Sequence, residues 1–112
     1  MELAQMELGS ICVCRISGRL DVAESDAFRS ALHDVAEETT GPIVLDLEGV
    51  AFIGSACLGA LIALRRHLGK DRPVALSGLS VPVHKLFKIS MIDRLFDIHP
   101  SAQDAVSAMK SG

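Results

Sequence analysis

The sequence predicts an α/β domain in which a mixed sheet of four to five strands is covered by four helices. Three observations lead to this prediction. Apolar, β-branched runs alternate along the chain with stretches that carry the i, i+3, i+4 stripe of an amphipathic helix. Glycine, proline and capping residues separate the two kinds of segment. The 112 residues are enough for one hydrophobic core and too few for two, so we expect a single domain over residues 1–112.

The chain is expected to begin with a pair of strands and a helix. Residues 2–8 and 11–16 flank Gly9–Ser10, a pattern typical of two strands joined by a tight turn. Asp21 is then a good N-cap for a helix that starts at about Val22. An apolar stripe marks one face of this helix: Phe28, Ala31, Leu32, Val35 and Ala36.

A buried strand followed by a second helix is expected at the centre of the chain. Residues 39–42 end the first helix, and the apolar run 43–47 is typical of a buried strand. A short loop over residues 52–53 leads to Ser55, where the next helix begins. The apolar residues of this helix recur on one face, and a glycine ends it: Leu58, Leu61, Ile62, Leu68 and Gly69.

Two more strands and two more helices are expected in the C-terminal part. Residues 72–77 are typical of a strand, and Ser80-Val-Pro82 opens a helix because proline is tolerated in a first turn. Residues 95–98 are a short strand candidate. Ser101-Ala-Gln-Asp104 is similar to a capping box and starts a final helix through Met109.

The composition and net charge argue against several classes of protein. The net charge is −3 and the basic residues are scattered, which argues against a nucleic-acid surface. The longest apolar run falls short of the ~20 residues that a membrane span needs, and the acidic start lacks the features of a secretory signal. An odd set of three cysteines is more simply explained by reduced thiols than by disulfides. We therefore expect a cytoplasmic protein without membrane insertion.

The cysteines and basic residues have structural explanations. Cys12 and Cys14 share one strand face, and no further ligands at metal-binding spacing are visible. We therefore expect these two cysteines to fill the hydrophobic core, and we expect no metal or cofactor. Cys57 at a helix start is read as a buried, inert thiol, although a reactive one is the alternative. The cluster Arg65-Arg-His67 is explained by the negative end of its helix.

Ser55 is the most informative residue of the chain. It lies between a buried strand and a helix, where unpaired backbone N–H groups and the helix dipole favour an anion such as phosphate. Serine is also a preferred N-cap. From position alone, Ser55 is therefore either a helix cap or a modification switch. No catalytic motif is visible in the sequence. Gly54-Ser-Ala-Cys57 lacks the second glycine of a nucleophile elbow, so we expect that the protein is not an enzyme.

Two motifs resemble those of STAS domains, the fold of bacterial anti-sigma factor antagonists. Asp46-Leu-Glu-Gly-Val-Ala-Phe-Ile-Gly-Ser-Ala-Cys-Leu-Gly59 is similar to the family's Asp-Leu-x-x-Val-x-Phe-Ile-Asp-Ser-Ser/Thr-Gly-Leu-Gly. Gly18-Arg-Leu-Asp21 is similar to Gly-Glu-Leu-Asp before the first helix. The resemblance implies that a partner kinase phosphorylates Ser55 and that Asp21 belongs to the contact surface for this kinase and anti-sigma factor.

The chain departs from the family motif at three positions next to Ser55. Gly54 stands where an acidic residue is usual, Ala56 replaces a second hydroxyl, and Cys57 replaces a glycine. Losing the acidic residue removes a like charge beside a phosphate, which favours the modified state. We expect Asp21, Gly54, Ser55, Ala56 and Cys57 to form the partner-binding site, in one contiguous patch with Arg65 and Arg66.

Two functions follow from the resemblance. In the first, the protein is a phospho-switch: it binds a serine kinase/anti-sigma factor of the histidine-kinase-like ATPase class while Ser55 is unphosphorylated, phosphorylation releases it, and a serine phosphatase resets it. In the second, it is a constitutive STAS subunit of a lipid-transport or signalling assembly, and Ser55 is only a helix cap.

Overall fold

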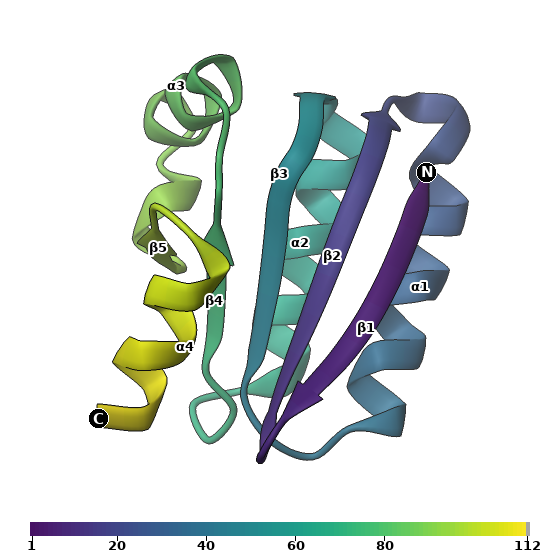
Figure 1. Ribbon diagram of the computed structural model, residues 1–112. Helices are drawn as coiled ribbons and strands as arrows, with labels where there is room; N and C mark the ends of the chain where they lie inside the picture. The colour runs from purple at the N-terminus through teal and green to yellow at the C-terminus, as the bar shows by residue number, and fades with distance from the viewer. Residues whose placement is uncertain (112) are drawn as a thin grey trace.

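A five-stranded mixed sheet forms the centre of the computed structural model, which describes residues 1–111 (Figure 1). Its strands follow one another in chain order, β1-β2-β3-β4-β5. Their bounds are Glu2–Leu8 for β1, Ile11–Leu20 for β2, Ile43–Ile53 for β3, Val74–Ser77 for β4 and Asp97–His99 for β5. Strand β1 is antiparallel to β2, and the other neighbours are parallel. The predicted mixed α/β fold is confirmed.

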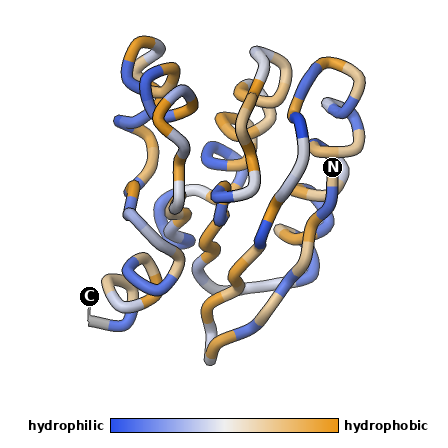
Figure 2. Tube along the Cα trace, turned by 45° about the horizontal axis from the view of Figure 1, so that its top comes forward, coloured by the Kyte–Doolittle hydropathy of each residue, from blue (hydrophilic) through white to orange (hydrophobic). Residues whose placement is uncertain are grey.

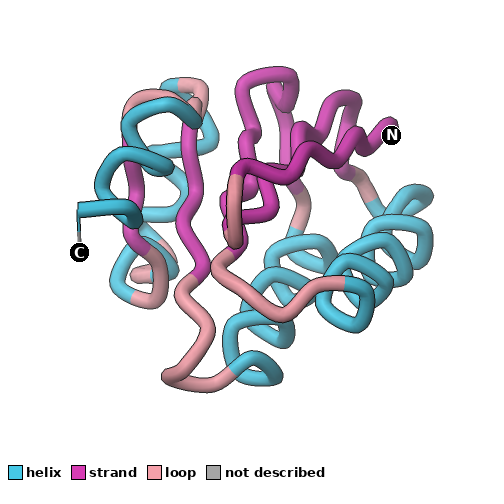
Figure 3. The backbone as a smooth tube through the Cα atoms, turned by 60° about the horizontal axis from the view of Figure 1, so that its bottom comes forward, coloured by secondary structure: helices cyan, strands magenta, loops and turns pink. Residues whose placement is uncertain are grey.

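Four α-helices cover the two faces of this sheet. They are α1 (Ser25–Glu38), α2 (Ser55–Leu68), α3 (Val81–Ile89) and α4 (Ala102–Ser111), and two short 3₁₀ helices, Val22–Glu24 and Ile92–Arg94, precede α1 and follow α3. Helices α1 and α2 lie side by side behind the sheet, and α4 lies in front of β4 (Figures 1 and 3). No helix among residues 1–111 is long and apolar enough to cross a membrane.

Alternating side chains divide the core into two parts. The larger part joins the sheet to α1, α2 and α3, and includes the fully buried Phe28, Leu61 and Phe87. The smaller part lies under α4, where Ala105 and Val106 pack on the other face of the sheet. Figure 2 shows the corresponding hydrophobic stretches along the central strands. The two-residue alternation of a strand and the 3.6-residue turn of a helix explain this division.

The predicted elements are present, and the bounds of four strands differ from the prediction. Strand β2 continues to Leu20, past the predicted end at residue 16, where its last residues pair with the extended end of β3. Strand β3 continues to residue 53, so the predicted loop over residues 52–53 is wrong: these residues pair with the end of β2 through two register irregularities. Strand β4 begins at Val74, two residues later than predicted, and the side chain of Arg72 before it donates hydrogen bonds to the carbonyl oxygens of Ala36 and Gly41. The last strand covers Asp97–His99, slightly later than predicted, where it pairs with β4.

Two predicted details of side-chain placement are confirmed. Cys12 and Cys14 share one strand face, are both buried, and have their Sγ atoms 3.7 Å apart. The Ser101 hydroxyl accepts a hydrogen bond from the Asp104 N–H at 3.1 Å, as a capping residue does at the start of α4.

Candidate partner-binding site around Ser55

Two turns meet at the carboxyl ends of β2 and β3, the upper ends of these strands in Figure 1. Leu20 and Ile53 pair across the two strands, and the N–H of Gly54 donates to the carbonyl oxygen of Leu20 at 2.8 Å. The next residues along each turn, Asp21 and Ser55, are therefore held close together in space. Functional sites of open α/β sheets commonly lie at the carboxyl ends of their strands.

Ser55 is exposed and is the first residue of α2. The predicted capping role of Ser55 is wrong, because Gly54 is the N-cap: its backbone is extended, with φ −94° and ψ 172°, and its carbonyl accepts from the Leu58 N–H at 3.0 Å. The Gly54–Leu20 bond holds the glycine at this position. Ser55 therefore presents a hydroxyl at the positive end of a helix without serving as its cap.

Asp21 caps the neighbouring turn, as predicted. Its Oδ1 accepts from the Glu24 N–H at 3.3 Å, at the start of the 3₁₀ helix that leads into α1. Its Oδ2 lies 3.6 Å from Nε of Arg19, and this ion pair is largely open to solvent. One carboxylate oxygen of Asp21 thus caps the turn, while the other pairs with Arg19 at the surface.

The side chain of Cys57 connects α2 to the turn that contains Asp21. Its side chain is buried, and its Sγ lies 3.7 Å from the carbonyl oxygen of Asp21. Burial, followed by the negative charge of Asp21, raises the pKa of the Cys57 thiol above its ordinary value. The thiol therefore stays protonated near neutral pH, which agrees with the interpretation of Cys57 as an inert packing residue.

The two other predicted site residues, Gly54 and Ala56, are half-buried at the same turn. The extended φ of Gly54 is open to any residue, so its conformation does not require glycine. A Cβ at this position would lie 3.5 Å from the Leu20 carbonyl oxygen and 3.7 Å from the ring of Phe52, which are ordinary contacts. The effect of Gly54 is therefore chemical: it leaves the position before Ser55 without a charge.

Arg19 and Phe52 belong to this surface and were missed as site residues from the sequence. They pair across β2 and β3, and the guanidinium carbon of Arg19 lies 4.1 Å from the centroid of the Phe52 ring. Such stacking of a cation on an aromatic face is favourable. The position of Arg19 within the Gly18–Asp21 motif was the available signal, but its pairing with Phe52 depends on a register irregularity after Gly18.

Exposed apolar side chains flank this surface on both sides. Phe52 is 39% exposed, and Val22, which follows Asp21, and Val81, at the start of α3, are 80% and 69% exposed. A shallow hollow of about 250 Å³ lies between the end of β3 and the first turns of α3, and Phe52 is one of its lining residues. Its lining residues are Ala51, Phe52, Ile53, Pro82, Val83 and Leu86. Exposed apolar residues bordered by charges are typical of protein interaction surfaces.

Arg65 and Arg66 lie elsewhere, so the prediction that they join the Ser55 patch is wrong. They are in the last turn of α2, ten and eleven residues after Ser55, which corresponds to about 15 Å or more along a helix. The Arg65 guanidinium donates hydrogen bonds to the carbonyl oxygens of Gly69 and Arg72 and so holds the loop after α2 in place. The helix carries its basic residues to the opposite end of the sheet.

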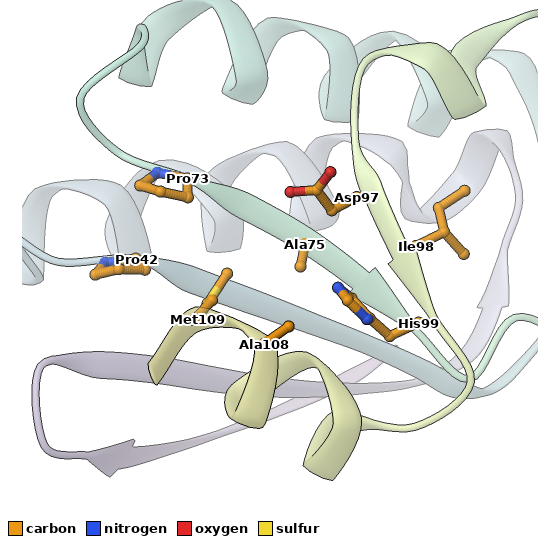
Figure 4. A pocket seen from close by; sticks show the side chains of 8 residues that line it. All are labelled: Pro42, Pro73, Ala75, Asp97, Ile98, His99, Ala108 and Met109. Atoms are coloured by element: carbon orange, nitrogen blue, oxygen red, sulfur yellow. The ribbon is translucent and has the colours of Figure 1, made fainter. Parts of the chain in front are cut away.

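A pocket of about 420 Å³ between α4 and the sheet is separate from the Ser55 surface (Figure 4). Pro42 and Pro73, which precede β3 and β4, place it toward the amino ends of these strands. Its other lining residues are Ala75, Asp97, Ile98, His99, Ala108 and Met109. Within residues 1–111, no group of three or more histidine, cysteine or acidic side chains is arranged to hold a metal ion.

Comparison with known families identifies the family of this chain. A family model described as the STAS domain matches residues 4–105. The chain belongs to the STAS domain family. A STAS-domain containing protein of Pseudomonas aeruginosa is 34% identical to it over 91 residues, which are 80% of this chain and 89% of that protein. The resemblance seen in the sequence is thereby confirmed.

Solved structures share the fold over nearly the whole chain. An anti-sigma factor antagonist from Mycobacterium paratuberculosis superimposes with a TM-score of 0.90, at 24% identity, over 97% of this chain and 93% of that one. The Bacillus cell fate determinant SpoIIAA in its phosphorylated form superimposes with a TM-score of 0.70, at 18% identity, over 96% of this chain and 99% of that one. At these identities the likeness shows the fold.

Proposed function

We propose that this protein is an anti-sigma factor antagonist that switches partners through phosphorylation of Ser55. With Ser55 unmodified, it binds a serine kinase/anti-sigma factor of the histidine-kinase-like ATPase class in the cytoplasm and frees the target of that factor. Phosphorylation by the kinase releases the protein, and a serine phosphatase restores the binding form. The relatives that share the fold support this proposal, since a structural neighbour is an anti-sigma factor antagonist and another is known in a phosphorylated form.

The observation that carries the proposal is the position of the Ser55 hydroxyl. It is exposed at the first residue of α2, beside Asp21, on a surface where charged and apolar side chains meet. Gly54 caps the helix, so the hydroxyl is not required for the fold. A constitutive role in which Ser55 is only a helix cap is therefore not favoured.

Phosphate at Ser55 would change binding without unfolding the domain. It adds about −1.5 to −2 charges and three acceptor oxygens. The amino end of α2 tolerates this charge. A partner that contacts Asp21 and Phe52 would meet a new dianion in the middle of its interface, and burying this dianion without a matching cation is unfavourable.

The protein itself is proposed to catalyse nothing. A phosphoacceptor serine needs only exposure, because the kinase supplies the nucleotide, the Mg²⁺ and the base. The residues on either side of Ser55 are Gly54 and Ala56, and neither has a group that accepts a proton.

A binding experiment with substituted proteins tests the proposal. We expect the purified kinase/anti-sigma factor to bind wild-type protein and Ser55→Ala with similar affinity, and Ser55→Asp at least about tenfold more weakly. Ser10→Asp, which adds the same charge at the turn between β1 and β2, is the matched control and should bind like wild type. ATP and Mg²⁺ alone should leave the mass of the protein unchanged. Equal binding of Ser55→Ala and Ser55→Asp would show that Ser55 is not the switch.

A further inference from the structure

The guanidinium group of Arg19 is a cation at the turn that carries Ser55. It stacks on the Phe52 ring, 4.1 Å from the centroid, and its Nε lies 3.6 Å from Oδ2 of Asp21. The side chain of Arg19 is 68% exposed. Exposed ion pairs of this kind are weak, so a stronger anion nearby would compete with Asp21 for the guanidinium.

Contacts through Phe52 and Gly54 connect Arg19 to Ser55. The ring under the guanidinium lies 3.7 Å from the point where a Cβ of Gly54 would stand, and Gly54 immediately precedes Ser55. Because Gly54 has no side chain, no carboxylate or bulky group stands at this point between the Phe52 ring and Ser55. The same turn is fixed by the bond from Gly54 to Leu20, the residue that follows Arg19.

We propose that Arg19 binds the phosphate group of phosphorylated Ser55. The phosphate takes the place of the Asp21 carboxylate at the guanidinium, while Phe52 keeps the guanidinium plane oriented. Arginine suits this role because its planar group donates two parallel hydrogen bonds to phosphate oxygens. This inference rests on the proposed phosphorylation of Ser55 and adds to it a phosphate-binding residue.

The exchange gives the switch a second effect besides the added charge. In the unmodified protein, Arg19 and Asp21 neutralise each other at the surface. After phosphorylation, Arg19 turns to the phosphate, and Oδ2 of Asp21 loses its cation. A partner that recognises the Arg19–Asp21 ion pair would then meet an unpaired Asp21 carboxylate and an arginine bound to phosphate. Arg19 would thus couple the phosphorylation of Ser55 to the loss of the ion pair at Asp21.

Protein carrying phosphoserine at position 55, inserted during translation, tests this inference without any kinase. The second pKa of the phosphate is measured by ³¹P NMR titration in about 0.1 M salt. A nearby guanidinium favours the dianion, so we expect Arg19→Gln to raise this pKa by about half a unit or more. Arg66→Gln removes the same charge about 15 Å away along α2, beyond the screening length of about 10 Å, and should leave the pKa close to that of wild type.

A conservative variant separates the charge from an indirect effect on the fold. Arg19→Lys keeps a cation at this position and should recover at least part of the shift, with the thermal melt of each variant confirming that it is folded. Equal pKa values in wild type and Arg19→Gln, or a lysine variant that titrates like Arg19→Gln, would overturn the inference. Failure of the kinase to modify Ser55 would contradict the proposed switch but would leave this titration unchanged, so the two failures are distinguishable.

Discussion

The N–H of Gly54 donates a hydrogen bond to the carbonyl oxygen of Leu20 at 2.8 Å, and this backbone contact joins the two turns of the site. Because main-chain atoms make the bond, it does not depend on the side chains at the surface. Asp21 and Ser55 are thus held together by the sheet itself. Substitutions of these residues should change the chemistry of the surface more than its shape.

The position before Ser55 should accept an acidic residue. Gly54 has an extended backbone and space for a Cβ, and aspartate is a good N-cap, so Gly54→Asp should leave the free energy of unfolding unchanged or raise it by a few tenths of a kcal/mol. Urea denaturation measures this difference. Gly54→Asn, which also caps but is neutral, is the control, and a loss of more than about 1 kcal/mol in both variants would contradict the geometry described for this turn.

The two roles of Asp21 can be separated by a pair of substitutions. Asp21→Ala removes the acceptor for the Glu24 N–H and should lower the free energy of unfolding by about 0.5–2 kcal/mol. Asp21→Asn keeps an acceptor oxygen and should be close to wild type in stability, yet it lacks the charge and should bind the partner more weakly. Thermal melts and binding assays on both variants check this. If Asp21→Asn binds like wild type, Asp21 is a cap and not part of the interface.

The buried thiols should make stability fall in alkaline solution. Burial raises the pKa values of Cys12, Cys14 and Cys57 above the ordinary 9.0, so above about pH 9 the unfolded chain loses thiol protons that the folded chain retains. Each such thiol should lower the free energy of unfolding by up to about 1.4 kcal/mol per pH unit in this range, and should have no effect well below pH 9. Urea titrations under reducing conditions measure the slope.

A single-cysteine variant is the control for this pH dependence. Cys14→Ala is expected to be less stable at neutral pH, because it leaves a cavity in the core, but to show a shallower decline above about pH 9. An identical slope in wild type and Cys14→Ala would show that other groups cause the alkaline effect.

The sequence predicted the parts of the fold that depend on local periodicity. The buried stripe of α1, with Phe28 and Leu32, follows from the helical repeat, and the shared face of Cys12 and Cys14 follows from the two-residue repeat of a strand. The position of Ser55 at the start of a helix was also predictable. Its place near Asp21 followed from the parallel order of the strands, in which successive carboxyl ends meet at one edge.

Features that depend on contacts distant in sequence were not predictable in the same way. Strand β3 runs past Glu48 and Gly49 because its later residues pair with residues 17–20 of β2, through register irregularities that no local pattern reveals. Gly54 is the N-cap because Leu20 anchors it, although serine is the commoner capping residue. The stacking of Arg19 on Phe52 depends on the same register.

Mass spectrometry of Ser55 in protein isolated from its native cells tests the central claim most directly. The tagged protein is separated by size into a partner-bound and a free pool, and the peptide that contains Ser55 is quantified in each with and without phosphate. The proposed switch predicts unmodified Ser55 in the bound pool and phosphorylated Ser55 in the free pool. Absence of phosphate on Ser55 in both pools, or the same phosphorylated fraction in both, would contradict it.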